Sequence, residues 1–482
     1  MQRIVFALAL VWTLLPSAVS AAPNILVIIA DDLGTESVAS YGIGEATAVT
    51  PTLDRLASAG VRFERFWSQH VCSPTRAAVL TGRYAFRTGV RSAIQARLTG
   101  ADAPTPTTPD HATTELVYTP AGLVRPGNPS PSARQPLPPD LRPRGPSTDE
   151  IMLPQLLKAA AEPYATAAVG KWHLADLLNG QADHPNDSGF DYFSGVFSGG
   201  PSSYFAWQHL ENGRLSAESG YYDTHITEDA IRWIGEQGDD PWFLWMSYSN
   251  PHTPVHLPPR ELLNSAARDL PPNFATEENN RAYFFAQVEA MDTLIGRLLD
   301  SIPEGVMQDT YVIFFGDNGT VEWHDPPPPR DRDRVKGTVY QGGIEVPLIV
   351  TGPGVAAGRV ERPISHAVDL FATILELAEV DADDVLPEDL AIDSVSIVDH
   401  LFEENLPSRR SWVLSEGTLG SVVGTAIRDE RYKLVVINER EEFYDLENDP
   451  NELNALAVED LSGAAQASHA TLSEQLRALA PR

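Results

Sequence analysis

The sequence predicts an α/β fold in which helices sandwich a large, mixed, mostly parallel sheet, followed by a smaller C-terminal subdomain of antiparallel strands and a helix. Residues 24–30 (NILVIIA) are apolar without a break, which is typical of a strand buried on both faces of a parallel sheet. Similar runs alternate with helical patterns as far as about residue 400. Beyond that point the runs are shorter and alternate between apolar and polar residues, which indicates antiparallel strands.

The expected elements follow one another in the order that such a fold requires. After the first strand we expect helices at 52–59, 75–80, 151–161 and 281–299, and strands at 164–169, 242–247, 311–315 and 346–350. The helix at 281–299 is amphipathic, because apolar residues recur on one side of it: Phe284, Val288, Met291, Ile295 and Leu298. In the C-terminal part we expect strands at 412–415, 425–428 and 432–437, then a closing helix at 461–479.

Two stretches depart from this pattern. Residues 1–20 combine a basic start at Arg3, a short apolar run and small residues at the end, which is typical of a signal peptide. Residues 101–148 are rich in proline and have no hydrophobic period, which predicts a long irregular insertion, either part of a substrate mouth or a surface excursion. We therefore divide the chain into a signal peptide at 1–20, a main domain at 21–400 that carries the site, and a C-terminal subdomain at 401–482.

The signal peptide predicts an exported protein, either periplasmic or secreted. Its apolar run is too short for a bilayer, and no later stretch reaches the roughly 18 apolar residues that a membrane span needs. Residues 318–320 (NGT) form a glycosylation sequon at a candidate metal ligand, which favours a bacterial source, because glycosylation there would block the site.

The net charge of −31 is large for 482 residues. It excludes nucleic acid as a partner, because the phosphate backbone would be repelled. Adaptation to a salty medium explains this charge better than a specific acidic function does. An anionic substrate would also be repelled at long range, so cationic side chains close to the site must capture it.

Cys72 is the only cysteine of the chain, so it has no partner for an internal disulfide. It opens residues 72–76 (CSPTR), where Pro74 fits the first turn of a short helix that ends at Gly82. Cys72 would then lie at a helix N-terminus, which favours an anion, and Arg76 would add a positive charge one turn later. The simpler alternative is a small buried hydrophobic residue. The neighbouring residues favour an anion site with a reactive group at its centre.

Polar residues follow four of the predicted strands: residues 31–32 (DD), 171–173 (KWH), 251–252 (PH) and 317–318 (DN). Because ligands bind beyond the carboxyl ends of parallel strands, we expect these residues to share one site. The oxygen donors among them suit Ca²⁺ or Mg²⁺ rather than zinc: Asp31, Asp32, Asp317 and Asn318. The structural alternatives are a helix cap at residues 31–32 and a tight turn at residues 317–318.

The C-x-P-x-R motif at Cys72, followed by T-G-R at 81–83, resembles the signature of the type I, formylglycine-dependent sulfatases, arylsulfatase-like members of the alkaline phosphatase superfamily. Further phrases are similar to those of the same family: residues 170–173 (GKWH), 251–254 (PHTP), 336–347 (KGTVYQGGIEVP), 428–434 (RDERYKL) and 444–450 (YDLENDP). The resemblance covers nearly the whole chain after residue 20. It implies an alkaline-phosphatase-like main sheet and the small C-terminal subdomain of sulfatases.

The resemblance also implies a cofactor and a modification. Cys72 would be oxidised by a formylglycine-generating enzyme to Cα-formylglycine (3-oxoalanine), whose hydrated aldehyde is the nucleophile. The metal would be Ca²⁺, held by the oxygen donors above together with modified Cys72. The reaction would be hydrolysis of the sulfate monoester of a small molecule or a carbohydrate, through a formylglycine–sulfate intermediate.

The same resemblance implies roles for the remaining site residues. Arg76, Lys171 and Lys336 would bind the sulfate and offset its charge. His252 would bind substrate and protonate the leaving oxygen together with Lys336, and His173 would act as the base that releases sulfate. Two other functions stay open: a phosphonate monoester or phosphodiester hydrolase on the same scaffold, and a non-catalytic binder of sulfated glycans. Three further histidines lack a matching phrase and are interpreted as structural: His324, His366 and His256. Of these, His366 is expected at the start of a helix together with Asp369.

The chain departs from the family pattern near Lys336. Gln341 stands where glutamate is usual and Glu345 where arginine is usual, which predicts that a structural ion pair is replaced or reorganised. Upstream, three arginines alternate with aspartates: Arg330, Arg332 and Arg334. They form either a self-neutralising solvated loop or a site at which one arginine binds a second anionic group of the substrate.

Overall fold

The computed structural model describes residues 22–94, 96, 98, 144–271, 279–324, 328–419 and 422–479, together with the short strands β4 (Val117–Thr119) and β5 (Gly122–Val124). The signal peptide predicted at 1–20 and most of the insertion predicted at 101–148 lie outside these residues. Within the insertion, β4 and β5 pair as an antiparallel hairpin, so the expectation of a wholly irregular segment was wrong there. A two-stranded ribbon this short gives no run long enough to reveal a period in the sequence.

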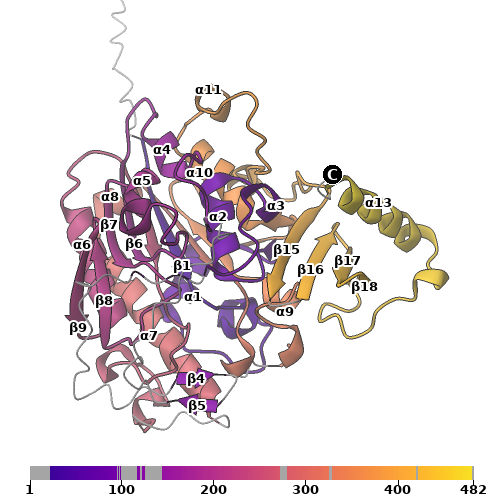
Figure 1. Cartoon of the computed structure of the whole chain (residues 1–482), viewed down its shortest axis with the longest axis horizontal. Coiled ribbons are helices and arrows are strands. Elements are labelled where there is room, and N and C mark those ends of the chain that lie inside the picture. Colours follow the sequence, from indigo (N-terminus) through magenta and orange to yellow (C-terminus); the bar gives the residue numbers. More distant parts are fainter. Residues whose placement is uncertain are drawn as a thin grey trace, which may run out of the picture.

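A ten-stranded mixed sheet forms the centre of the molecule, in the order β13-β2-β12-β11-β1-β10-β6-β7-β8-β9 (Figure 1). Its strands are β1 (Asn24–Ala30), β2 (Val61–Phe63), β6 (Ala165–Lys171), β7 (Tyr192–Val196), β8 (Ala206–Glu211), β9 (Arg214–Ser219), β10 (Trp242–Ser247), β11 (Thr310–Gly316), β12 (Leu348–Thr351) and β13 (Arg359–Glu361). The central strands from β11 to β7 run parallel, and β12, β8 and β9 are antiparallel to their neighbours. The predicted mixed α/β sheet is confirmed.

Strand β1 is buried along its whole length because both faces of the sheet are covered. Ile25, Val27 and Ile29 face one hydrophobic core, to which α2 (Cys72–Thr81), α4 (Leu153–Leu157) and α10 (Leu370–Leu377) contribute. The alternate residues of β1 face the other core, formed with α1 (Pro51–Ala59), α6 (Tyr222–Gly235) and α7 (Asn280–Ser301). This two-sided burial explains the unbroken apolar run.

The predicted helices exist, with shifted ends. The helix at the cysteine motif, α2, begins at Cys72, and Gly82 ends it in the left-handed conformation. In α7 the five apolar residues predicted to face inward are all fully buried. Helix α4 spans Leu153–Leu157 only, shorter than the predicted 151–161, because the chain then turns back and the N–H of Tyr164 donates to the carbonyl of Leu157 at 3.3 Å.

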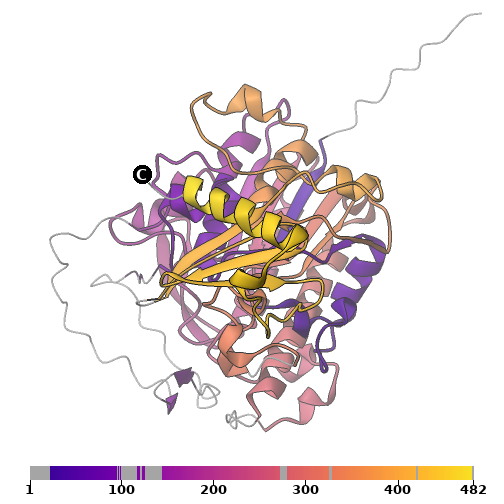
Figure 2. The same ribbon diagram turned by 90° about the vertical axis from the view of Figure 1, so that its right-hand side faces the viewer.

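The C-terminal part forms a separate antiparallel sheet, as predicted, but with four strands instead of the three expected: β15 (Val413–Leu419), β16 (Val422–Arg428), β17 (Tyr432–Ile437) and β18 (Arg440–Asp445). The closing helix α13 (Gly463–Leu479) lies across this sheet (Figure 2). Leu472 of α13 packs against Leu434 and Phe443 of the strands. Strand β18 (REEFYD) escaped prediction, because only its last residues carry the apolar alternation.

Across the described parts of the chain, no helix is both long and apolar enough to pass through a bilayer.

Candidate active site

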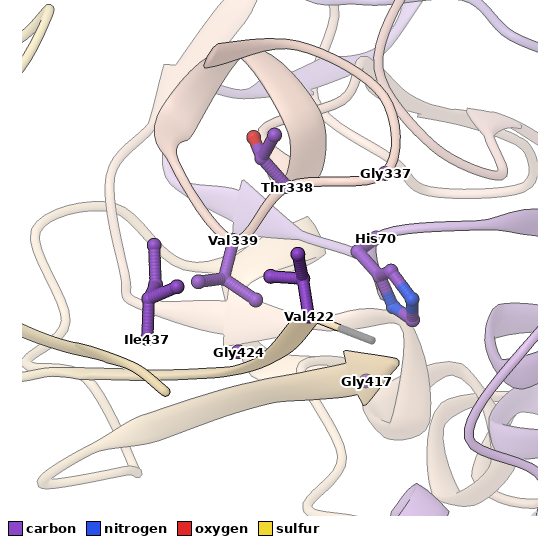
Figure 3. A pocket seen from close by; sticks show the side chains of 8 residues that line it. All are labelled: His70, Gly337, Thr338, Val339, Gly417, Val422, Gly424 and Ile437. Atoms are coloured by element: carbon purple, nitrogen blue, oxygen red, sulfur yellow. The ribbon is translucent and has the colours of Figure 1, made fainter. Parts of the chain in front are cut away.

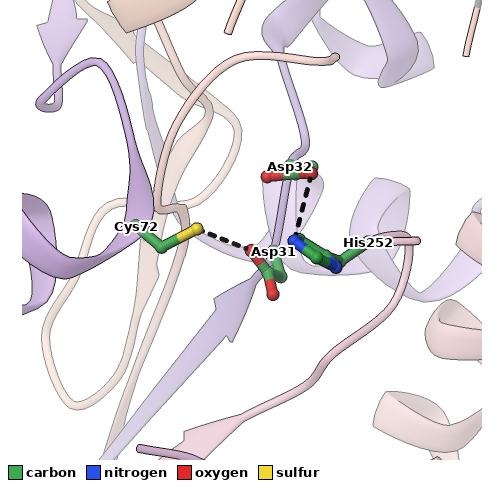
Figure 4. Close-up of side chains that lie close together, drawn as sticks. All are labelled: Asp31, Asp32, Cys72 and His252. Atoms are coloured by element: carbon green, nitrogen blue, oxygen red, sulfur yellow. Dashed lines mark hydrogen bonds and ion pairs between the residues drawn. The ribbon is translucent and has the colours of Figure 1, made fainter. Parts of the chain in front are cut away.

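The carboxyl ends of β1, β6, β10 and β11 converge on the N-terminus of α2, and the predicted site residues meet there. The thiol of Cys72 donates to Oδ1 of Asp31 at 3.3 Å, and Figure 4 shows its sulfur pointing at that carboxylate. Lys171, at the end of β6, donates from Nζ to Oδ2 of Asp31 at 2.5 Å. All three side chains are buried. A shared position at the parallel strand ends therefore explains why polar residues recur after four separate strands.

Asp32 lies at the centre of a second set of contacts. Asn318 donates from Nδ2 to Oδ1 of Asp32 at 2.8 Å, and Nζ of Lys336 donates to the same oxygen. Nε2 of His252 lies 3.9 Å from Oδ2 of Asp32, with the imidazole turned toward the carboxylate (Figure 4). Burial by itself would raise the pKa of Asp32, but the ammonium groups of Lys336 and Lys171 outweigh it and hold this pKa well below its ordinary range. Asp32 is therefore ionised.

Arg76 and Asp317 form a fully buried ion pair. Nε and Nη2 of Arg76 donate to Oδ2 of Asp317 at 3.0 and 2.8 Å. Nη1 donates to the carbonyl of Lys171 at 2.9 Å and to Oγ of Ser247 at 2.5 Å. Each terminal nitrogen of Arg76 thus already donates to a protein acceptor. The guanidinium ties the ends of β6, β10 and β11 together, and these contacts use four of its five N–H groups, so its charge is the main thing it offers to an anion.

The donors around Asp31 and Asp32 suit a hard divalent cation. Oδ1 of Asn318 is buried and has no hydrogen-bond partner among the described residues. Burial raises the pKa of Asp317, and the neighbouring Asp31 raises it further. Ligand atoms of Asp31, Asp32, Cys72 and His252 lie within 4.8 Å of one another. An orphaned amide oxygen beside clustered carboxylates is what a Ca²⁺-type site requires, so these residues fit the cation that the sequence predicts.

The thiol of Cys72 is a poor nucleophile in this environment. Burial raises the pKa of Cys72 far above its usual value, and the carboxylates of Asp31 and Asp317 raise it further. Reactive thiols instead have a lowered pKa in electropositive surroundings. The ammonium of Lys336 lies nearby, with Nζ 3.6 Å from Sγ. The surroundings of residue 72 therefore favour chemistry other than that of a thiolate.

Two histidines flank the cluster and are both neutral. His173 is buried and its Nε2 lies 2.9 Å from the carbonyl of Ile94; burial, Lys171 and Arg76 hold its pKa well below the usual value. Nδ1 of His252 donates to the carbonyl of Thr253 at 2.6 Å, which leaves Nε2 directed at the site. Burial lowers the pKa of His252 to about 3, although Asp32 opposes this change.

Lys336 is the protonated group of the site. Burial opposes its charge, but the carboxylates of Asp32 and Asp31 together raise the pKa of Lys336. Its backbone is fixed on both sides: the N–H of Lys336 donates to the carbonyl of Thr320 at 3.1 Å, and that of Gly337 to the carbonyl of His70 at 2.8 Å. Lys336 is therefore held in place as a proton-bearing cation between Asp32 and Cys72.

The loop that carries His252 is supported by residues that no sequence motif revealed. The hydroxyl of Tyr204 donates to the carbonyls of Ser249 and His252 at 2.7 and 2.8 Å. Asp223, at the start of α6, accepts from the N–H groups of Ser249 and Asn250 at 3.4 and 3.3 Å. Tyr204 and Asp223 come from stretches without a recognisable phrase, so the sequence carries no signal that could have found them.

Glu345, one of the two positions at which the chain departs from the family pattern, contacts both Gln341, the other such position, and Arg330. Glu345 accepts from Nη2 of Arg330 at 2.5 Å and from Nε2 of Gln341 at 2.8 Å. Arg330 also lies 3.7 Å from Glu36 and is 7% exposed, so it is not the arginine that would bind a second anionic group of the substrate. The guanidinium of Arg334 stacks on the ring of Tyr340 at 4.5 Å. Arg330 and Gln341 are thus the two groups that face the carboxylate of Glu345.

A small hollow lies between the C-terminal sheet on one side and His70 with the loop at residues 337–339 on the other (Figure 3). Its lining comes from both parts: His70, Gly337, Thr338, Val339, Gly417, Val422, Gly424 and Ile437. The imidazole of His70 lies against Gly417, where a Cβ atom would be 1.6 Å from His70 Cε1. The C-terminal sheet therefore packs closely beside the segments that carry Cys72 and Lys336.

Of the three histidines interpreted as structural, His366 matches the prediction closely. Its ring accepts from the N–H of Val368 and caps a short helix together with Asp369. Nε2 of His256 lies 3.0 Å from the hydroxyl of Tyr221, and its Nδ1 lies 2.9 Å from the carbonyl oxygen of Pro254. His324 stacks on Phe284 with ring centroids 4.7 Å apart.

The chain was compared with families and proteins of known identity. The family model described as sulfatase matches residues 23–380, and one described as N-sulphoglucosamine sulphohydrolase, C-terminal, matches residues 334–481. The human N-acetylgalactosamine-6-sulfatase is 28% identical, over 83% of this chain and 70% of that protein. The uncharacterized sulfatase YdeN of Escherichia coli (strain K12) is 27% identical, over 78% of this chain and 65% of that protein.

Solved structures share the fold. The structure of Ps i-CgsB in complex with k-i-k-neocarrahexaose superposes with a TM-score of 0.71 at 22% identity, covering 95% of this chain and 92% of that chain. A protein solved in complex with its substrate D-glucosamine-2-N,6-O-disulfate gives a TM-score of 0.69 at 20% identity, with coverage of 95% and 98%. A match of the sulfatase model to most of the residues shows that this chain belongs to the sulfatase family, the sulfuric ester hydrolases of the alkaline phosphatase superfamily.

Proposed function

We propose that this sulfatase hydrolyses a sulfate monoester with a formylglycine at position 72 and Ca²⁺ bound beside it. The observation that carries the proposal is the position of Cys72: it begins α2 and lies among Asp31, Lys171 and Lys336, with a thiol whose pKa is raised rather than lowered. A residue that is a poor thiolate nucleophile but is surrounded by anion-binding groups suits conversion to another nucleophile.

The residues that would hold the cation are Asp31, Asp32, Asp317, Asn318 and the modified residue 72. When bound, Ca²⁺ would supply positive charge that offsets the sulfate and favours ionisation of the hydrated aldehyde. The support for this assignment is the all-oxygen character of the four unmodified ligands and the unpaired Oδ1 of Asn318.

The cationic side chains of this chain bind and orient the sulfate. Lys171 and Lys336 present ammonium groups on either side of residue 72, and Arg76 adds the charge of a guanidinium fixed by Asp317. A sulfate ester resists attack because of its own negative charge, so fixed positive charges lower the barrier where negative charge develops. Their burial strengthens the effect, since water screens them little.

Lys336 and His252 share the proton transfer to the leaving oxygen. Lys336 bears a proton, because its pKa is raised, whereas His252 is neutral with Nε2 turned to the site. In this geometry Lys336 is the group that holds the proton, and His252 accepts a hydrogen bond or relays that proton. His173, buried and neutral, is the base that takes a proton from residue 72 when sulfate leaves.

The substrate that we propose is a sulfated carbohydrate. The human relative is named N-acetylgalactosamine-6-sulfatase, and one structural neighbour was solved with a sulfated glucosamine. We also propose that residues 1–20 direct export to the periplasm or the medium of a bacterium and are then removed, and that a formylglycine-generating enzyme matures the chain before use.

Production with and without a formylglycine-generating enzyme tests the proposal. Peptide mass spectrometry should show that residue 72 has lost sulfur and two hydrogens and gained one oxygen only in the first preparation. That preparation should release sulfate from sulfated sugars or aryl sulfates, and the thiol form and Cys72→Ala should not. Faster turnover of aryl phosphonates or phosphodiesters would favour the esterase alternative. Confirmed formylglycine without any turnover would favour a sulfated-glycan binder and overturn the proposal.

A further inference from the structure

A second polar cluster lies outside the active site, where β8 meets α6. His209 comes from β8, and His225 and Asp229 are one turn apart on α6. Nε2 of His225 lies 3.5 Å from Oδ2 of Asp229, and Nε2 of His209 lies 3.9 Å from the same oxygen. The ligand atoms of all three residues lie within 4.8 Å of one another. The two imidazoles meet edge to face, with ring centroids 4.9 Å apart.

We propose that His209, His225 and Asp229 bind a divalent transition-metal ion of the zinc type. A tetrahedral site with metal–ligand bonds of about 2.0–2.2 Å separates its ligands by roughly 3.3–3.5 Å. The separations of Asp229 from the two histidines, 3.5 and 3.9 Å, lie within a few tenths of an ångström of this range, and the two imidazole ligand atoms are at most 4.8 Å apart. The spacing of four residues between His225 and Asp229 places both on one face of the helix.

The surroundings of Asp229 direct Oδ2 at the two histidines, although Oδ2 also accepts a hydrogen bond from the hydroxyl of Ser194. Arg232 donates from Nη2 to Oδ1 at 2.8 Å and so orients the carboxylate, while Oδ2 faces the histidines. Metal-bound carboxylates are usually held by such an outer partner. Oγ of Ser194, on β7, lies 2.5 Å from Oδ2 of Asp229 and 2.9 Å from Nε2 of His209. The Ser194 hydroxyl could therefore serve as a fourth ligand beside the two imidazoles and the carboxylate. It would then give up or share its contact with His209 when the metal binds.

The donor set distinguishes this cluster from the active site. Two imidazoles and one carboxylate suit zinc, nickel or copper, whereas the active-site carboxylates and amide suit calcium. The cluster is also partly accessible: His209 is buried, while the side chains of His225 and Asp229 are 31% and 14% exposed. A metal can therefore enter from solvent without passing the catalytic residues.

The position of the cluster gives the metal a structural role. Ser194, His209 and the two ligands on α6 belong to three elements, so one ion joins β7, β8 and α6 at this end of the sheet. Helix α6 also carries Asp223, which holds the backbone of the His252 loop. We therefore expect the metal to stabilise the protein and to affect turnover only weakly.

Titration of the chelator-treated protein with Zn²⁺ in excess Ca²⁺ tests the inference, because calcium blocks the active-site carboxylates. Calorimetry should show one zinc per chain with a Kd in the micromolar range or below, and Co²⁺ should give the visible absorption of a tetrahedral site. His225→Ala and Asp229→Asn should weaken binding by about 100-fold or more, because each removes a ligand. Zinc should raise the melting temperature of the unaltered protein only.

The matched control is His469→Ala, because His469 pairs with Glu441 at the surface without a third ligand. This variant should bind zinc as the unaltered protein does. Equal melting temperatures of the variants in chelator show that they fold. Zinc binding that survives in His225→Ala, or the absence of stoichiometric binding to the unaltered protein, would overturn the inference. The outcome does not depend on formylglycine or on turnover, so it is separate from the proposed function.

Discussion

The cluster around Cys72 and the cluster around Asp229 both pack against the main sheet, yet they balance charge in opposite ways. At the first, Asp31, Asp32 and Asp317 are buried; Asp31 and Asp317 contact the fully buried cations Lys171 and Arg76, and Asp32 contacts Lys336, whose side chain is 14% exposed. At the second, a single carboxylate near the surface meets two imidazoles, a hydroxyl and one arginine. Buried charges depend on one another, because water does not replace a lost partner. The first cluster should therefore fail when any member is removed, whereas the second should tolerate substitution.

The largest effect is expected for Lys171→Met. It leaves Asp31 buried without its ammonium partner, which should cost about 3–5 kcal/mol of stability, and it should lower kcat/KM on a sulfate ester by about 1,000-fold or more. Thermal unfolding and steady-state kinetics measure the two effects. The matched control is Lys158→Met, which removes a partner of Asp191 from a pair that is 36% and 52% exposed and should cost at most about 1 kcal/mol. Similar losses in both variants would contradict the comparison.

Asp223 gives the next effect, because it is a buried carboxylate held by backbone N–H groups. Burial raises its pKa from 3.8 to about 7, although Ser249 and Asn250 donate to it. In the native state Asp223 then binds a proton more tightly than it does in the unfolded chain. The stability that this bound proton contributes is complete below about pH 4 and is lost as the pH rises to about 7. Relative to Asp223→Asn, the unaltered protein should lose up to about 4 kcal/mol over this range. Urea unfolding of both proteins at pH 5 and pH 8 measures this loss. An equal change in the free energy of unfolding of the two proteins between these pH values would contradict the prediction.

Removal of divalent cations should have an intermediate effect that is confined to the first cluster. With Ca²⁺ at about 100 times its Kd, binding stabilises the folded state by about 2.7 kcal/mol, and a chelator should remove that stability. Asn318→Leu, which lacks the unpaired Oδ1, should lose most of the response to added calcium. Melting temperatures with chelator, calcium and zinc separate the two clusters. A calcium response that depends on His225 instead would reverse the assignment.

The smallest effect is expected at the rearranged ion pair. Glu345→Gln removes one of two carboxylates that face buried Arg330 but leaves Glu36, so it should cost about 1–3 kcal/mol. The loop that carries Lys336 should then be held less firmly, and kcat should fall more than KM rises. Glu430→Gln, at a surface pair with Arg65, is the control and should change neither quantity measurably.

Much of the fold followed from local patterns. The apolar run of β1 predicted its burial on both faces, and the proline and glycine around α2 predicted a helix that starts near Cys72 and ends at Gly82. Local patterns failed where an element is short or mostly charged. The β4–β5 hairpin and β18 were missed for this reason, because a few residues carry too little periodicity to stand out.

The sequence by itself determined which residue types the active site contains, because polar groups directly after buried apolar strands are costly unless they share a ligand or partners. Only the tertiary structure decided which of them pair: Lys171 with Asp31, Lys336 with Asp32, Arg76 with Asp317 and Arg330 with Glu345. Tertiary packing also brings Tyr204 and Asp223 to the His252 loop, and it brings His209 against His225. Most of these contacts join residues far apart in the chain, and the energy of a buried charge depends on neighbours that no local pattern records.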